Sequence, residues 1–86
     1  MKVPQALLDE MIEHTRADDP DECCGLIGGI GDEAKTLHRM ENIAHSPLRY
    51  EMDPNEQLRV YKEILEAGHD VVGIYHSHTR TAAYPS

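Results

Sequence analysis

The order in which apolar and turn-forming segments follow one another constrains the fold of this chain most. Pro4 can begin a helix, and apolar residues then recur at helical spacing up to the polar break at residues 18–20. Two apolar runs, residues 22–27 and 70–75, are typical of short buried strands. Between them, residues 53–56 have the capping residues of a helix start. The succession of helix, hairpin, helix and strand predicts an α/β or α+β fold.

The glycine-rich residues 28–32 are expected to form the turn of the hairpin, with a partner strand at residues 35–44 and a short extended piece at 49–52. A second helix is expected from Asp53 to about Ala67, ended by Gly68 and packed on one face of the sheet. Residues 70–75 are expected to be a central strand.

Size and charge exclude several classes of protein. The 86 residues suffice for one domain, and eight basic against sixteen acidic residues give 8 − 16 = −8. This charge repels phosphate backbones and anionic membranes, so neither nucleic acid nor a membrane is an expected partner. No apolar run approaches the ~20 residues that span a bilayer, and the N-terminus lacks a signal-peptide pattern. Because Cys23 and Cys24 are adjacent, they do not indicate a disulfide framework, and the cytoplasm is the expected location.

Two histidines stand at alternate positions where the apolar run 70–75 stops. His76 and His78 would project from one face of an extended strand, with Ser77 pointing away. Two imidazoles on one face can converge on a metal ion, although a bare H-x-H pattern is also common in surface loops. Glu22 is a candidate general base at the rim of a strand. Its alternative is a solvated side chain in the acidic run 18–22.

The spacing of these residues resembles a known family. The segments "ECCGLIGG" and, about 50 residues later, "HSHTRTAAYPS" resemble the JAMM (MPN-plus) metallo-hydrolases. The family motif is a Glu, then H-[ST]-H, seven residues, Ser, two residues and Asp. Here His76-Ser77-His78 is followed by seven residues and then Ser86. The chain looks most similar to bacterial members that release cysteine from the C-terminus of a sulfur-carrier protein.

The resemblance implies a site and a fold. His76 and His78 become zinc ligands, Glu22 the general base and acid, and Ser86 a donor to the oxyanion. The implied fold is an MPN-type (cytidine-deaminase-like) α/β domain with a mixed sheet flanked by helices. The motif's Asp, the third zinc ligand, would fall three residues beyond Ser86. Residues 1–86 are therefore expected to be the N-terminal part of a single JAMM/MPN domain, truncated at its C-terminus. In this form the zinc affinity is expected to be weakened.

The resemblance also implies a substrate. We expect hydrolysis of an amide at the C-terminus of a small ubiquitin-like sulfur-carrier protein, with release of cysteine. An isopeptidase or deubiquitinase-like peptidase is the alternative, and a non-catalytic MPN scaffold is another. Self-association is a further hypothesis, because missing C-terminal elements would leave a sheet edge or an apolar patch open.

The sequence gives weaker support for other kinds of chemistry. A thiol enzyme would use Cys23 or Cys24, but a nearby Glu22 would raise a thiol pKa, and buried packing residues are the preferred interpretation. The H-x-E and P-C-x-x-C signature of zinc deaminases does not occur. Residues 50–52 could line a substrate groove. The remaining histidines are expected to lie at the surface or to be partly packed: His14, His38, His45 and His69.

Overall fold

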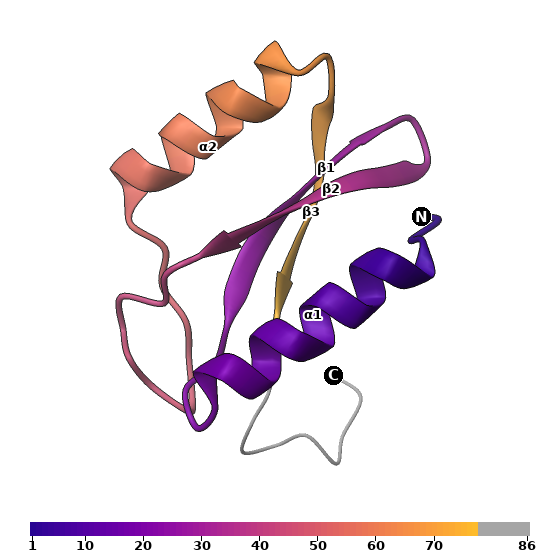
Figure 1. Ribbon diagram of the computed structural model, residues 1–86. Helices are drawn as coiled ribbons and strands as arrows, with labels where there is room; N and C mark the ends of the chain where they lie inside the picture. The colour runs from indigo at the N-terminus through magenta and orange to yellow at the C-terminus, as the bar shows by residue number, and fades with distance from the viewer. Residues whose placement is uncertain (78–86) are drawn as a thin grey trace.

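The computed structural model describes residues 1–77, which form a small α/β fold (Figure 1). Its elements in chain order are α1 (Gln5–Asp18), β1 (Cys24–Ile30), β2 (Glu33–Met40), α2 (Pro54–Glu66) and β3 (Asp70–His76). This confirms the predicted fold class and both predicted helices. Within the described residues, neither helix has the length and apolar character needed to cross a bilayer. His78 and Ser86 lie outside the described residues.

The sheet has the strand order β2-β1-β3, so β1 is its central strand. Both pairings are antiparallel, and parallel pairing within residues 1–77 is limited to an isolated bridge between Lys2 and Glu33. The sequence prediction put residues 70–75 at the centre of a mixed sheet. In the described part of the chain they lie at an edge instead. The glycines of β1 suit the central place, because side chains of both neighbouring strands and of α2 approach its backbone closely.

The hairpin turn is tighter than predicted. Gly28 and Gly29 belong to β1, and the chain turns at Gly31 and Asp32, where Gly31 has a φ of 57°. An added Cβ would lie 2.5 Å from Thr36 Oγ1 at Gly28 and 2.3 Å from a backbone oxygen at Gly29, so close packing explains these two glycines. The predicted turn at residues 28–32 was therefore wrong in extent. The partner strand is Glu33–Met40 instead of 35–44, and residues 49–52 belong to no strand.

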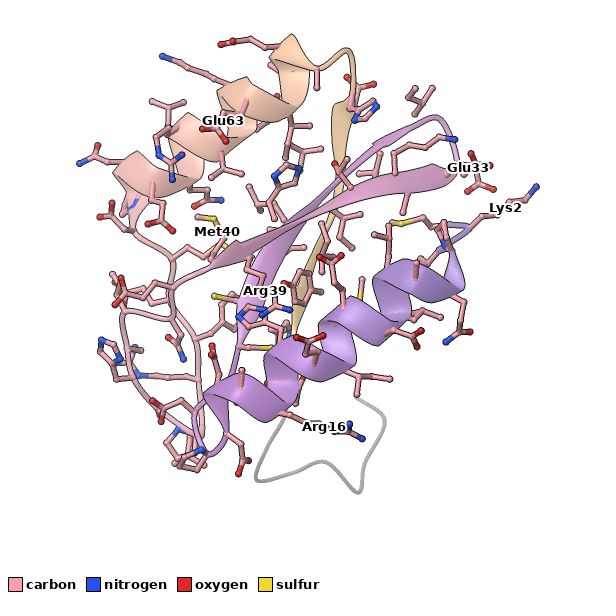
Figure 2. All side chains as sticks on the ribbon, in the orientation of Figure 1. Lys2, Arg16, Glu33, Arg39, Met40 and Glu63 are labelled. Carbon is pink, nitrogen blue, oxygen red and sulfur yellow. The ribbon has the colours of Figure 1, made fainter. Side chains whose placement is uncertain are left out.

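The two helices cover opposite faces of the sheet. Side chains of neighbouring strand residues point in opposite directions, as Arg39 and Met40 of β2 illustrate (Figure 2). Arg39 approaches Glu13 of α1 at 3.9 Å, whereas Met40 is buried in the core on the side of α2. This core consists of Cys24, Leu26, Met40, Met52, Val60 and Ile64. The face that carries Cys24 and Leu26 is therefore the face on which α2 lies.

The position of α2 depends on a local cap. Asp53 accepts a hydrogen bond from the Glu56 N–H at 3.0 Å, and Pro54 occupies the first helical position. Gly68, with a φ of 83°, follows the helix and lets the chain return into β3. These signals were visible in the sequence, and they fix where α2 begins and ends.

Candidate functional site

Glu22 and His76 lie together where β3 ends. Glu22 precedes β1 and is buried, with 4% of its surface exposed. His76 is the last residue of β3 and lies opposite Cys24 in the sheet register, on the face of α2. Its Nδ1 atom is 3.9 Å from Glu22 Oε1, and its side chain is 32% exposed. The structure thus brings together two of the four residues singled out in the sequence, a buried carboxylate and a solvent-accessible imidazole.

Ser77 attaches this end of the chain to the start of β1. The Cys23 N–H donates to Ser77 Oγ at 2.9 Å, and the Ser77 N–H donates to the Cys23 carbonyl at 3.1 Å. The segment that follows His76 is therefore paired with the segment that follows Glu22. This pairing keeps the carboxylate and the imidazole at the same end of the sheet.

Tyr50 covers one face of the His76 ring. The two ring centroids are 4.5 Å apart and the planes are inclined by 23°, a stacked arrangement. The sequence pointed to residues 50–52 only as a groove lining, and Met52 is instead part of the buried core. Tyr50 could not have been paired with His76 from the sequence, because 26 positions separate them and no pattern links them.

The described residues do not form a metal site by themselves. No group of three metal-ligating side chains occurs within residues 1–77. An imidazole at a strand end beside a buried carboxylate nevertheless fits the ligand chemistry of zinc. Any such site would have to draw further ligands from residues beyond Ser77.

Comparison with known proteins identifies the family of this chain. The model of the family described as prokaryotic homologs of the JAB domain matches residues 4–86. The chain belongs to this family. The match confirms the resemblance on which the expected site residues were chosen.

The JAB-domain chain is similar to several proteins in sequence and in structure. It is 44% identical over 82 residues to the CysO-cysteine peptidase of Mycobacterium tuberculosis, a match that covers 93% of this chain and 56% of the relative. It is 38% identical to the desampylase of Haloferax volcanii, covering 91% and 61% of the two chains. A protein of Desulfitobacterium hafniense solved in solution superposes with a TM-score of 0.85 at 36% identity, covering 99% of this chain and 61% of the other. The JAB-domain chain thus spans little more than half the length of these proteins.

The two cysteines of the JAB-domain chain are packing residues. Both are unpaired and fully buried, Cys24 in the core on the side of α2 and Cys23 beside the Thr15 hydroxyl of α1. Burial, with a smaller contribution from Cys23, raises the pKa of Cys24 to about 11. A thiol that stays protonated at neutral pH is a poor nucleophile. The cause is mainly burial, whereas the sequence argument had relied on Glu22.

His14 is the histidine that the sequence misplaced. It was expected at the surface or partly packed, but it is only 4% exposed. Its Nδ1 atom lies 2.8 Å from the Tyr75 hydroxyl and its Nε2 atom 3.2 Å from Asp18 Oδ2. Burial lowers the pKa of His14, and Arg39 adds to this effect, while Asp18 opposes it. The partner of His14 is 61 positions away, so no local pattern could have revealed its role.

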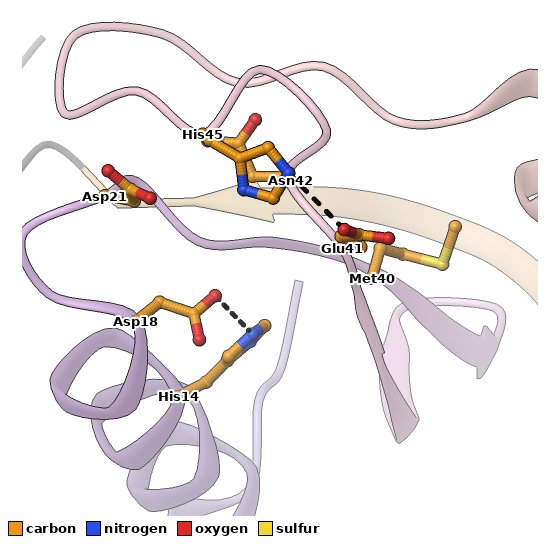
Figure 3. A pocket seen from close by; sticks show the side chains of 7 residues that line it. All are labelled: His14, Asp18, Asp21, Met40, Glu41, Asn42 and His45. Carbon is orange, nitrogen blue, oxygen red and sulfur yellow. Dashed lines mark ion pairs between the residues drawn. The ribbon is translucent and has the colours of Figure 1, made fainter.

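His14 also borders a pocket of about 300 Å³ at one end of α1 (Figure 3). Its walls include two histidine–carboxylate contacts, His14 with Asp18 at 3.2 Å and His45 with Glu41 at 3.5 Å, drawn as dashed lines in Figure 3. The lining residues are His14, Asp18, Asp21, Met40, Glu41, Asn42 and His45. Neither Glu22 nor His76 lines this pocket, but its lining residue Asn42 donates a hydrogen bond to the Glu22 carbonyl at 2.9 Å.

Proposed function

We propose that the protein is a zinc-dependent hydrolase that cleaves an amide at the C-terminus of a ubiquitin-like sulfur-carrier protein and releases cysteine. The observation that carries the proposal is the buried Glu22 carboxylate, 3.9 Å from His76 Nδ1 at the end of β3. The 44% identity to a CysO-cysteine peptidase supports the substrate class. Free, buried cysteines agree with the cytoplasm as the proposed location.

His76 and His78 would hold the zinc ion, together with a ligand that lies outside this sequence. When bound, zinc acidifies a water molecule and polarises the carbonyl of the amide to be cleaved. The stack of Tyr50 on His76 and the pairing of Ser77 with Cys23 support this role, because they limit the movement of the strand end. Support of this kind is typical of residues that orient metal ligands.

Glu22 would transfer the proton that the reaction requires. The carboxylate accepts a proton from the attacking water as the new C–O bond forms, and it returns that proton to the amine nitrogen as the C–N bond breaks. Its burial and its position 3.9 Å from His76 Nδ1 support this role, because a proton carrier has to lie beside the ligands of the metal. Ser86 would donate a hydrogen bond to the carbonyl oxygen as negative charge develops on it.

Isopeptidase action on a carrier–lysine conjugate is the second candidate. The 38% identity to a desampylase supports it, since that relative is matched over 91% of this chain. A non-catalytic scaffold is less consistent with the sequence, because Glu22, His76 and His78 are all present.

The decisive experiment offers both substrates to the longest form of the protein that the gene encodes. A carrier–cysteine adduct and a carrier–lysine conjugate are incubated with it, and the products are followed by mass spectrometry. We expect cleavage of the cysteine adduct, and none by His76→Ala, which should also lose zinc. If neither substrate is cleaved by folded, zinc-loaded protein, the hydrolase proposal is wrong. Cleavage of the lysine conjugate alone would establish the second candidate.

Self-association remains a prediction. Apolar side chains on α2 and β3 are exposed in the described structure, and β3 is at a sheet edge; the larger ones are Leu58, Tyr61, Leu65 and Ile74. Sedimentation over a wide concentration range tests the prediction, and a strict monomer would contradict it.

A further inference from the structure

Asn42 is a buried amide in the loop between β2 and α2, and the catalytic proposal has assigned it no role. It is 5% exposed, and its side chain bonds only to backbone atoms. An amide offers two N–H donors and one oxygen that can accept twice. Here that capacity is fully used. Its Nδ2 donates to carbonyls of Glu22 at 2.9 Å, Arg49 at 3.1 Å and Ser46 at 3.5 Å, and its Oδ1 accepts from the N–H groups of Ala44 and Glu51, each at 3.0 Å.

These bonds connect two segments that are distant in the sequence. One partner is the carbonyl of Glu22, the proposed proton carrier. Two others, the Arg49 carbonyl and the Glu51 N–H, lie on either side of Tyr50. The Asn42 side chain therefore joins the backbone on both sides of Tyr50 to the backbone of Glu22. It acts together with two backbone bonds of the same loop, from the Glu22 N–H to the Ser46 carbonyl and from the Ile43 N–H to the Glu51 carbonyl, each at 2.9 Å.

Tyr50 in turn contacts His76. Its ring is stacked on the imidazole at 4.5 Å and also packs against the core on the side of α2. An aromatic ring held in this way restricts rotation of its partner about χ2. The imidazole is thus contacted on its face by Tyr50 and approached at Nδ1 by Glu22. The backbone of both neighbours is bonded, directly or through the adjacent residues, to the same amide.

We propose that Asn42 and Tyr50 are positioning residues of the site: Asn42 fixes Tyr50 and Glu22 relative to each other, and Tyr50 holds the His76 ring in the orientation of a metal ligand. The metal part of this inference rests on the proposed function, whereas the placement of the His76 ring does not. Loss of residues that support a metal ligand typically weakens metal affinity 10–100-fold.

The test has two readouts and five variants, three at the proposed positioning residues and two controls. NMR signals of the His76 ring protons, measured without metal, report the stacked tyrosine through its ring current. Zinc affinity is measured by competition with a chelator, at a temperature at which every variant is folded. Tyr50→Leu removes the ring but keeps apolar volume, and Tyr50→Phe keeps the ring. Asn42→Asp keeps the shape and the accepting oxygen but loses the N–H donors to Glu22 and Arg49.

We expect Tyr50→Leu and Asn42→Asp to move the His76 ring signals downfield and to weaken zinc binding about 10–100-fold. Tyr50→Phe should keep both the ring signals and the zinc affinity of the unaltered protein. The control variants Tyr61→Leu and Asn55→Asp alter exposed residues of α2 and should change neither readout.

The outcomes separate the two proposals. If the His76 signals stay in place in Asn42→Asp, or if zinc affinity is unchanged while they move, the positioning role is overturned and Asn42 serves only the fold. If the unaltered protein, in its longest natural form, binds no zinc, the zinc-hydrolase proposal fails by itself, and the ring signals still decide whether Asn42 places Tyr50.

Discussion

Two histidine–carboxylate pairs flank the end of β3, and they differ in almost every physical respect. On the side of α1, His14 bonds to Asp18 and to the hydroxyl of Tyr75, and it is buried. On the side of α2, His76 lies 3.9 Å from Glu22, beyond hydrogen-bond length, and is 32% exposed. The two pairs lie on opposite faces of the sheet because the side chains of Tyr75 and His76, which are neighbours in β3, point in opposite directions.

The first pair is a completed structural unit. A carboxylate only accepts, so His14 Nε2 must donate to Asp18; in a neutral imidazole Nδ1 then accepts from the Tyr75 hydroxyl. The lowered pKa of His14 agrees with this neutral form. Burial also raises the pKa of Tyr75, which keeps its hydroxyl proton in place. Comparison with the second pair teaches that an imidazole beside a carboxylate indicates chemistry only where solvent and substrate can reach it.

The largest expected effect comes from matched changes of the two carboxylates. Glu22→Gln should retain zinc and reduce turnover about 10²–10⁴-fold, because an amide cannot accept the proton of water. Asp18→Asn, the same change in the other pair, should leave the turnover of folded protein unchanged. Steady-state kinetics with metal analysis checks both. If Glu22→Gln lost its zinc, Glu22 would be a metal ligand. If Glu22→Gln and Asp18→Asn lost the same turnover, the two pairs would not differ in function.

The next effect concerns the glycine that makes room for the first pair. An added Cβ at Gly25 would lie 2.3 Å from Tyr75 Cε1, so Gly25→Ala must displace the ring and its bond to His14. We expect the free energy of unfolding to fall by about 1–3 kcal/mol, as in other overpacked cores. Urea unfolding measures it. Gly31→Asn is the control, since nothing lies within 4 Å there and Asn tolerates a φ of 57°. Equal stability of Gly25→Ala and the parent would contradict the crowding.

A smaller effect should appear as a pH dependence. Because the folded-state pKa of His14 is below its ordinary value of 6.5, the unfolded chain binds the proton first as pH falls. His14 therefore contributes full stability above about pH 6.5, and this is lost as pH falls from 6.5 toward the lowered value, by about 1.4 kcal/mol per unit of pKa difference. Urea unfolding at pH 7.5 and pH 5.5 should show a smaller decline in His14→Gln than in the parent. Identical declines would show that His14 does not titrate differently in the folded chain.

The smallest effect separates the second pair from thiol chemistry. Cys24 lies opposite His76 in the register, so a reactive thiol there would offer another explanation of the site. With a pKa of about 11, only about one Cys24 in a thousand is a thiolate at pH 8. We expect iodoacetamide to label Cys24 only after unfolding, as mass spectrometry of digested protein would show. Rapid labelling of the native protein would revive the thiol hypothesis.

The sequence was a good guide where the signal is local. Asp53 and Pro54 begin a helix through their own side chains and backbone, and the structure places α2 where they predicted it. Gly28 was misassigned to a turn because its role depends on Thr36 and Ile64, which pack against it from other elements. His14 was misjudged for the same reason, since its partner Tyr75 comes from the far end of the chain.

The candidate site divides in the same way. The motif spacing singled out Glu22 and His76, and the structure brings them together, although their chemical roles stay predictions. Spacing cannot reveal Asn42, whose five backbone partners become neighbours only when the loop closes. A side chain that bonds only to backbone atoms does not require particular residue types as partners, so no sequence motif reveals it.

The paired bonds between Ser77 and Cys23 have a consequence for how the molecule can be observed. Both N–H groups are donors in these bonds, so their exchange with solvent deuterium requires the end of β3 to separate from β1. The exchange rates of these two amides therefore measure how often the strand end opens. They report the integrity of the site before any metal or substrate has been added.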